Sequence, residues 1–235
     1  MQAVILAGGK GTRLRPFTTF LPKPLVPIDN VPILEIVLRQ LKHYGFRSSV
    51  LAVNHLAELI MTFFGTGEKI GIDITYSRED KPLGTAGPLT IIPNLEENFL
   101  VMNGDLLTTI DYKKLFDSHV AHSNDITICT TKREVKIDLG VLEIEDMKFI
   151  DYKEKPTLSY WVSTGIYIIN KKVVSAIPHG VQYDMPTLVL RMKNEGKKIG
   201  CYTDDFFWLD IGRVEDYETA VKIYSDRKNE FLPHG

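Results

Sequence analysis

Short apolar runs of strand length alternate with longer segments of helical periodicity along most of this chain. Buried strands are predicted where continuous apolar runs end in polar or glycine residues, and helices where apolar positions recur every three to four residues. The predicted strands are 2–9, 48–54, 72–79, 98–105, 125–133, 162–170 and 197–203. The predicted helices are 31–45, 55–67, 110–122, 184–196 and 213–228, with a short helix and turn over 84–92.

This regular alternation favours a parallel sheet whose strands are joined by right-handed helical crossovers. We therefore expect an α/β fold, a Rossmann-like three-layer α/β/α sandwich with a mostly parallel mixed sheet. The stretch 140–156 departs from the alternation and predicts a hairpin that turns near Glu145, Asp146 and Met147. We expect one domain over 1–235.

Polar residues follow the predicted strands, which is where ligands bind in open α/β sheets. They include Gly8 to Arg13 after the first strand, Glu79 to Thr85 after the third, and Asn103 to Asp105 after the fourth. Asp210 lies in a later apolar segment, WLDIG. These positions are the candidates for chemistry.

Composition and charge narrow the class of protein. The formal net charge of −2 lacks the basic surplus of a nucleic-acid-binding domain. No apolar run approaches the length of a membrane span, and no leader peptide is visible, so we expect a cytoplasmic protein that binds neither nucleic acid nor membrane. Cys129 and Cys201 fall in strand-like runs and are expected to be small buried residues rather than a disulfide or a metal site.

The glycine-rich turn after the first strand could hold an anion, because glycine lets backbone N–H groups converge closely. Arg13 and Lys23 would add two cations suited to phosphate oxygens. The turn lacks the third glycine of a dinucleotide fingerprint and the G-x-x-x-x-G-K-[ST] run of a Walker loop. Taken alone, such a turn is as often a purely structural turn as a phosphate site, and if it binds an anion, the two cations suit a triphosphate better than a single carboxylate.

Several motifs, taken in order, are more specific than the turn alone. The string LAGGKGTRLRP with PKPL downstream resembles the signature of the sugar-1-phosphate nucleotidylyltransferases. Further resemblance lies in PLGTAGPL, VMNGDLL, EKP, STGIY and FWLDIGRVEDY, so it covers roughly residues 1–220. PLGTAGPL is similar to the loop of the mannose-1-phosphate guanylyltransferases.

The resemblance implies the nucleotide-diphospho-sugar transferase type of fold and transfer of a nucleotidyl group from a nucleoside triphosphate to a sugar 1-phosphate. It also implies a nucleotide-binding part over about 1–110 and a sugar-phosphate-binding part over about 111–235 of the single domain. It implies catalytic roles for Arg13, Lys23 and Asp105, and a Mg²⁺ ion held by Asp105 and Asp210. The implied nucleotide-binding residues are Leu6, Ala7, Gly8, Gly9, Gly11, Thr12, Arg13, Glu79, Gly84 and Thr85. The implied sugar-phosphate-binding residues are Gly140, Glu154, Lys155, Thr164 and Tyr167.

The base is expected to be guanine, hence GTP as substrate. Where some relatives read uracil or thymine with a glutamine, this chain has Glu79, a pure acceptor that matches the two adjacent donors of guanine. Uridylyl or other nucleotidyl transfer, and a non-catalytic homologue that senses nucleotide sugars, remain alternatives. The sugar 1-phosphate is left open among those of mannose, glucosamine, a heptose and N-acetylmuramate. The resemblance to the family also implies a homodimer.

Overall fold

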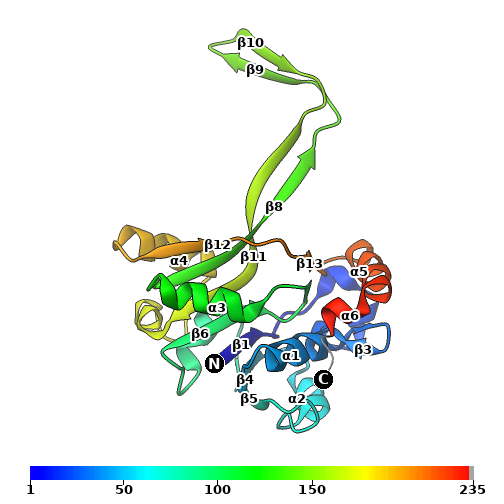
Figure 1. The fold of residues 1–235 in the computed structure, drawn as a ribbon, viewed down its shortest axis with the longest axis vertical. Coiled ribbons are helices and arrows are strands. Elements are labelled where there is room, and N and C mark those ends of the chain that lie inside the picture. The colour runs from blue at the N-terminus through cyan, green and yellow to red at the C-terminus, as the bar shows by residue number, and fades with distance from the viewer. Residues whose placement is uncertain (233–235) are drawn as a thin grey trace.

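A seven-stranded mixed sheet forms the centre of the protein, whose computed structural model describes residues 1–232. The strand order is β12-β8-β11-β6-β1-β4-β5 (Figure 1). The bounds are β1 Gln2–Leu6, β4 Ser48–Val53, β5 Asp73–Arg78, β6 Asn98–Asn103, β8 Ile126–Lys136, β11 Thr157–Asn170 and β12 Ile199–Tyr202.

Most neighbouring strands in the sheet run parallel. β1 pairs in parallel with β4 and β6, β4 with β5, and β8 with β12, whereas β11 runs antiparallel to both β6 and β8. The expected three-layer α/β/α sandwich with a mostly parallel mixed sheet is confirmed. β11 runs in the opposite direction because the chain passes from β8 to β11 through a hairpin instead of a helical crossover.

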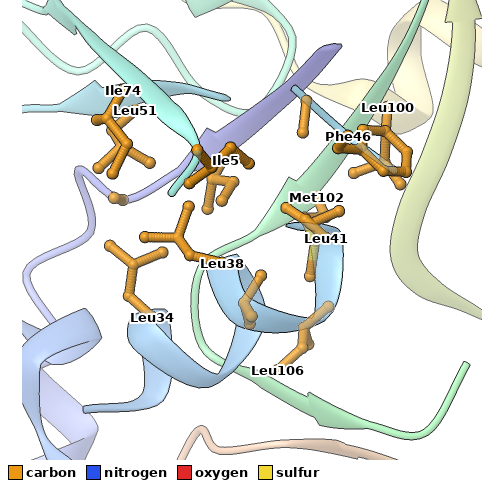
Figure 2. Close-up of a cluster of buried hydrophobic side chains, with 14 of the residues drawn as sticks. Ile5, Leu34, Leu38, Leu41, Phe46, Leu51, Ile74, Leu100, Met102 and Leu106 are labelled. Atoms are coloured by element: carbon orange, nitrogen blue, oxygen red, sulfur yellow. The ribbon is translucent and has the colours of Figure 1, made fainter. Parts of the chain in front are cut away.

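Three helices bury apolar side chains against one face of the sheet. They are α1 (Ile33–His43), α2 (Ala57–Phe64) and α3 (Tyr112–Ala121). Figure 2 shows Leu34, Leu38 and Leu41 of α1 pointing at Ile5 and Met102 of the central strands. Burying such side chains stabilises the fold by about 1.5–3 kcal/mol each, and this cluster fixes the strands whose ends carry the candidate residues.

The opposite face of the sheet is covered by α4 (Met185–Asn194) together with two short 3₁₀ helices, Gly87–Ile91 and Lys171–Ala176. A third cluster packs α5 (Val214–Asp226) and α6 (Lys228–Phe231) on the outer side of α1. The remaining short elements are β2 (Pro27–Ile28), β3 (Val31–Pro32) and 3₁₀ turns at Thr12–Leu14, Phe17–Thr19 and Lys23–Leu25. Each helix of the described residues is too short or too polar to cross a bilayer.

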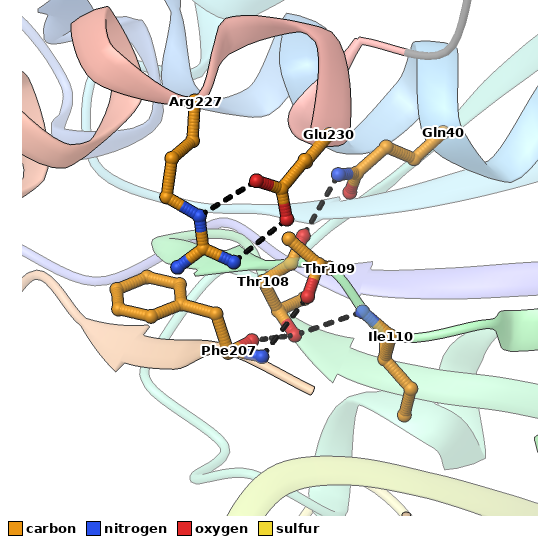
Figure 3. A network of polar contacts seen from close by, with 7 residues as sticks. All are labelled: Gln40, Thr108, Thr109, Ile110, Phe207, Arg227 and Glu230. Carbon is orange, nitrogen blue, oxygen red and sulfur yellow. Dashed lines mark hydrogen bonds and ion pairs between the residues drawn. The ribbon is translucent and has the colours of Figure 1, made fainter. Parts of the chain in front are cut away.

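A small second sheet joins two segments that lie about a hundred residues apart. β7 (Leu106–Thr108) pairs antiparallel with β13 (Trp208–Asp210), and the sequence pattern did not predict either strand. In Figure 3 the buried amide of Gln40 donates to the carbonyl of Thr108 at 2.8 Å, and the hydroxyls of Thr108 and Thr109 bond the backbone of Phe207. Buried polar groups satisfied in this way lock the two strands together and against α1.

His119, in the last turn of α3, is buried and bonded on both ring nitrogens. Its Nδ1 lies 2.9 Å from the hydroxyl of Thr127, and its Nε2 lies 3.1 Å from Oδ1 of Asn98. Burial disfavours the charged ring and lowers the pKa of His119 from 6.5 to about 4. His119 is therefore a structural histidine that ties α3 to the sheet.

This burial predicts a specific pH dependence of stability. Because the pKa is lower in the folded state, the unfolded chain takes up the proton first, so stability present above pH 6.5 is lost as the pH falls towards 4. The loss should be on the order of 2 kcal/mol, and His119→Gln should lack it. Urea unfolding of both proteins between pH 7 and pH 4 measures the difference, and parallel curves would contradict this role.

The strands β8 and β11 run on past the sheet as a two-stranded arm (Figure 1). At its end the predicted hairpin is confirmed as β9 (Val141–Glu145) and β10 (Lys148–Lys153), with Asp146 and Met147 at positive φ in the turn. One local expectation was wrong: Cys201 is exposed, because edge strand β12 leaves it uncovered. Lys155 has a φ of 43°, because the chain bends there into β11.

Candidate active site

The carboxyl ends of β1, β4, β5 and β6 meet at one edge of the sheet because these strands are parallel neighbours. A cavity of about 350 Å³ opens at this edge, which we call the strand-end cavity. Its lining comprises Leu6, Ala7, Gly8, Gly9, Lys23, Pro24, Asn54, Glu79, Pro82, Gly84, Thr85, Asn103, Gly104 and Asp105. Most of the predicted nucleotide-binding residues therefore lie together, although they come from two segments about seventy residues apart in the chain, 6–9 and 79–85.

Gly8 lies where the backbone passes very close to its neighbours. A Cβ atom at this position would stand 3.1 Å from the Cβ of Asn54 and 3.2 Å from Oε1 of Glu79. A Cβ here would require Asn54 or Glu79 to shift by a few tenths of an ångström, so a larger side chain would crowd this wall of the cavity.

Glu79 presents a buried carboxylate to the strand-end cavity. Its Oε2 accepts a hydrogen bond of 2.8 Å from the backbone N–H of Leu83, and its own carbonyl accepts one of 2.9 Å from the Asn54 amide. Burial raises the pKa of Glu79, and the Leu83 hydrogen bond partly offsets the rise. The carboxylate is thus held rigidly at the end of β5 with Oε1 beside Gly8.

The loop around Gly84 and Thr85 is fastened to the start of α4. Gly84 has a φ of 78°, and a Cβ there would stand 2.5 Å from Oδ1 of Asp184. That same oxygen accepts from the Thr85 N–H at 3.2 Å, and the Thr85 hydroxyl accepts from the Met185 N–H at 2.7 Å. The Thr85 side chain therefore holds the loop in place, while the backbone of the loop faces the cavity.

Lys23 brings together the two carboxylates that the sequence separates by more than a hundred residues. Its ammonium pairs with Oδ2 of Asp105 and lies 3.9 Å from Oδ1 of Asp210. Its side chain is only 11% exposed, so the charge is held in place rather than free in solvent. Pairing of β13 with β7 sets Asp210 opposite Leu106, and the Ile211 N–H bonds the carbonyl of Asp105 at 3.2 Å.

The two carboxylates fit a divalent cation. Oδ1 of Asp105 is buried without a hydrogen-bond partner, which is costly unless a ligand or ion satisfies it. Burial and the neighbouring Asp105 charge raise the pKa of Asp210, while Lys23 and Arg13 lower it. Within residues 1–232 no cluster of three or more metal-ligating side chains occurs, so the remaining ligands of such an ion would be phosphate and water oxygens, as Mg²⁺ prefers.

Arg13 lines a second cavity of about 440 Å³, which we call the Arg13 cavity. Asp210 and Arg213 also line it, and so do Thr131, Lys132 and Arg133 at the root of the arm. Lys23 and Asp105 belong to the strand-end cavity, so the ion pairs of Lys23 mark the border between the two spaces. An extended polyanion could therefore run from one cavity into the other past Lys23.

The predicted sugar-phosphate residues divide into two groups. Thr164 is fully buried and donates to the carbonyl of Cys129 at 2.9 Å, and the Tyr167 hydroxyl lies 2.8 Å from Oγ of Ser163. Both lie in β11 within the sheet. Gly140 and Glu154, by contrast, lie on the arm.

On the arm, Gly140 and Glu154 both lie against Tyr152 and line neither cavity. The Tyr152 hydroxyl donates to Glu154 at 2.5 Å and occupies the space beside Gly140 where a Cβ would stand. Lys155 follows in the bend before β11 and is exposed. Gly140, Glu154 and Lys155 are thus absent from both cavity linings within a single chain. Gly11 and Thr12, which begin the turn that carries Arg13, also lie outside the linings.

Two residues of the site were not among the predicted ones. Asn54 follows β4, and Asp184 reaches back to the Gly84 loop from the start of α4. The rule that ligands bind beyond strand ends could have found Asn54. No local signal marks Asp184, because its role depends on a contact across 99 positions.

Known proteins are similar to this chain over nearly its whole length. The sequence profile described as Nucleotidyl transferase matches residues 2–227. The chain is 36% identical to a UTP–glucose-1-phosphate uridylyltransferase of Synechocystis over 99% of its own length and 66% of the relative's length. It is 33% identical to a D-glycero-alpha-D-manno-heptose 1-phosphate guanylyltransferase of Aneurinibacillus thermoaerophilus, over 94% of this chain and 97% of that protein.

A solved structure of similar fold is HddC from Yersinia pseudotuberculosis complexed with GMP-PN, with a TM-score of 0.73 and 26% identity over 95% of this chain and 99% of that chain. The chain spans about two thirds of the length of several similar curated relatives, including a probable mannose-1-phosphate guanylyltransferase of Oryza sativa at 34% identity over 96% of this chain and 65% of the relative. From its matched length, its fold and the motifs that form the site, this chain belongs to the nucleotidyl transferase family, within its sugar-1-phosphate nucleotidylyltransferases.

Proposed function

We propose that this protein joins a nucleoside triphosphate to a sugar 1-phosphate, giving a nucleoside diphosphate sugar and pyrophosphate. The observation that carries the proposal is the position of Lys23, paired with Asp105 and close to Asp210 where the two cavities meet. Two polyanions must approach each other in this reaction, and a fixed cation beside two carboxylates is suited to that task.

The chemistry needs positioning more than proton transfer. An oxygen of the sugar phosphate attacks the α-phosphorus, the new phosphorus–oxygen bond forms, and the bond to the leaving pyrophosphate breaks. The attacking oxygen is already ionised at neutral pH, so no general base is required. Lys23 would neutralise charge near the α-phosphate, and Arg13 would grip the leaving phosphates with its planar fork.

Asp105 and Asp210 would hold a Mg²⁺ ion, which when bound supplies further neutralisation of the phosphate charge. Support comes from the partnerless buried Oδ1 of Asp105 and from the backbone bond that ties Ile211 to residue 105. The positions of both carboxylates are set by the β7–β13 pairing rather than by loop mobility. The metal site would thus be largely built before substrate arrives.

For the base, we propose guanine, and hence GTP as the preferred substrate. Guanine offers two adjacent donors, and Glu79 offers a buried acceptor in the strand-end cavity. Two of the similar proteins named above are guanylyltransferases, one a uridylyltransferase. The carboxylate of Glu79 therefore favours guanine over uracil, whose edge also presents acceptors.

Replacing Glu79 by glutamine tests this choice of base. Glu79→Gln should lower the ratio of kcat/KM for GTP to that for UTP by about tenfold, because a mismatched buried hydrogen bond costs about 1–3 kcal/mol. Asp80→Asn, a neighbouring exposed carboxylate, is the matched control and should leave the ratio unchanged. If Glu79→Gln leaves the ratio as it is in the wild type, Glu79 does not read the base.

A substrate screen tests the proposed activity itself. The protein is incubated with each of the common nucleoside triphosphates, Mg²⁺ and a panel of sugar 1-phosphates, among them mannose, glucosamine, heptose and N-acetylmuramate 1-phosphates. Pyrophosphate release that requires both substrates is the expected result. Tight binding of nucleotide sugars without any turnover would instead support a non-catalytic sensor and overturn the proposal.

A further inference from the structure

The arm leaves the body of the protein without support from other strands. β12 pairs with β8 only as far as Cys129, and β6 pairs with β11 only from Ile166 onwards. Beyond these points the two strands pair only with each other and lead to the β9–β10 hairpin, which Figure 1 shows far from the rest of the molecule. An isolated two-stranded ribbon is marginally stable in water, so a partner surface is expected.

The hairpin at the end of the arm has one apolar and one polar face. Cross-strand partners lie on the same face, and Leu142 pairs with Tyr152 while Ile144 pairs with Phe149. On the other face Glu143 lies opposite Asp151, and Glu145 opposite Lys148. Sheets with such a pattern normally bury the apolar face.

Nothing within the described chain covers that apolar face. Leu142, Ile144, Phe149 and Tyr152 are 52, 59, 66 and 51% exposed. Ten of the nineteen exposed large apolar side chains of residues 1–232 lie between Val135 and Trp161. An exposed apolar patch of this density indicates an interaction surface.

A second copy of this chain is the occupant that the structure favours. When two identical arms pack antiparallel about a two-fold axis, the tip of each lies beside the root of the other. The roots offer apolar contacts of their own, because Tyr160 and Trp161 are 52 and 60% exposed. The root of the arm in a second copy therefore offers apolar side chains against which the hairpin can pack.

Charge agrees with this arrangement. Residues 138–155 at the tip carry six acidic and three basic side chains. The Arg13 cavity at the root is lined by four basic residues, Arg13, Lys132, Arg133 and Arg213, against three acidic ones. Opposite net charges at tip and root favour their approach across two copies.

We propose that two copies of this chain pair through their arms, so that each hairpin lies over the Arg13 cavity of the other copy and brings Glu154 and Lys155 to it. The contribution to the site rests on the proposed function, whereas the pairing of the arms does not. The arrangement places in one site the candidate residues that a single chain holds apart.

Sedimentation of the full chain tests the pairing without any substrate. The wild type should be a dimer, and the double variant Ile144→Ser with Phe149→Ser should be a monomer at the same concentration. The matched control, Glu145→Ser with Lys148→Ser, changes the adjacent cross-strand pair on the polar face and should remain a dimer. A monomeric wild type, or a dimeric apolar-face variant, overturns the proposal.

Complementation tests whether the site is shared. Asp105→Asn damages the body and Lys155→Ala damages the tip, and each variant alone should lose activity by at least about tenfold. Co-expressed in equal amounts, they should recover about a quarter of the wild-type activity, because half of the dimers are mixed and each holds one intact site. No recovery, or full activity of Lys155→Ala alone, overturns the shared site, whereas an inactive wild type that still dimerises through its arms overturns only the proposed function.

Discussion

Replacing Lys23 by methionine should lower kcat/KM for nucleotidyl transfer by about a hundredfold to a thousandfold. Methionine keeps the length of the side chain but removes the charge that pairs with Asp105 and lies 3.9 Å from Asp210. The two carboxylates would then face each other and the incoming phosphates with no buried cation between them. Steady-state rates of pyrophosphate release measure the effect.

The control for this prediction is a lysine of the same kind far from the site. Lys222 is exposed on α5, so Lys222→Met should change kcat/KM by less than about twofold, as most surface substitutions do. Thermal unfolding of both variants separates a loss of activity from a loss of fold. A decrease smaller than tenfold for Lys23→Met would remove Lys23 from the catalytic machinery.

Asp105→Asn should lower turnover by about a hundredfold or more. Asparagine matches the shape of aspartate, so packing is kept while the charge that faces Lys23 and the candidate metal is lost. The Mg²⁺ concentration needed for half-maximal activity should also rise by about tenfold or more. Titrations of activity with Mg²⁺ give both quantities.

Asp117→Asn is the matched control, because Asp117 is exposed on α3 and pairs only with Lys113 among the described residues. This variant should keep wild-type turnover and Mg²⁺ dependence, since exposed ion pairs contribute little. If Asp105→Asn behaves in the same way as this control, Asp105 is not part of a metal site.

The strand-end cavity was largely predictable from local sequence. Gly8, Glu79 and Asp105 each follow a strand that the sequence pattern predicts, and parallel pairing brings the ends of such strands to one edge. The helices of the two layers were predictable for the same reason, since their apolar periodicity is long and regular. Local sequence patterns thus predict the sheet and the residues at its edge.

The position of Asp210 was not predictable in this way. It depends on pairing of β13 with β7, two strands of three residues each that lie about a hundred positions apart. Such short strands have no periodicity to read, and their pairing is fixed by contacts of Gln40, Thr108 and Phe207 from three different segments. The sequence marked Asp210 as a candidate, but only the family resemblance paired it with Asp105.

The arm shows a further limit of sequence reasoning. The hairpin itself follows from the pattern of residues 140–156, but the extension of β8 and β11 beyond the sheet does not. The sequence pattern of a strand is the same whether or not a neighbouring strand pairs with it. The pattern therefore could not show that Gly140, Glu154 and Lys155 lie on an arm outside the central sheet. Their placement is a property of the whole sheet.

The most direct test of this account is a crystal structure of the protein with Mn²⁺ and a non-hydrolysable nucleoside triphosphate. We expect an anomalous Mn²⁺ peak between the carboxylates of Asp105 and Asp210, with the base in the strand-end cavity and the phosphates passing Lys23. A triphosphate bound elsewhere, or a Mn²⁺ ion that contacts neither carboxylate, would contradict it.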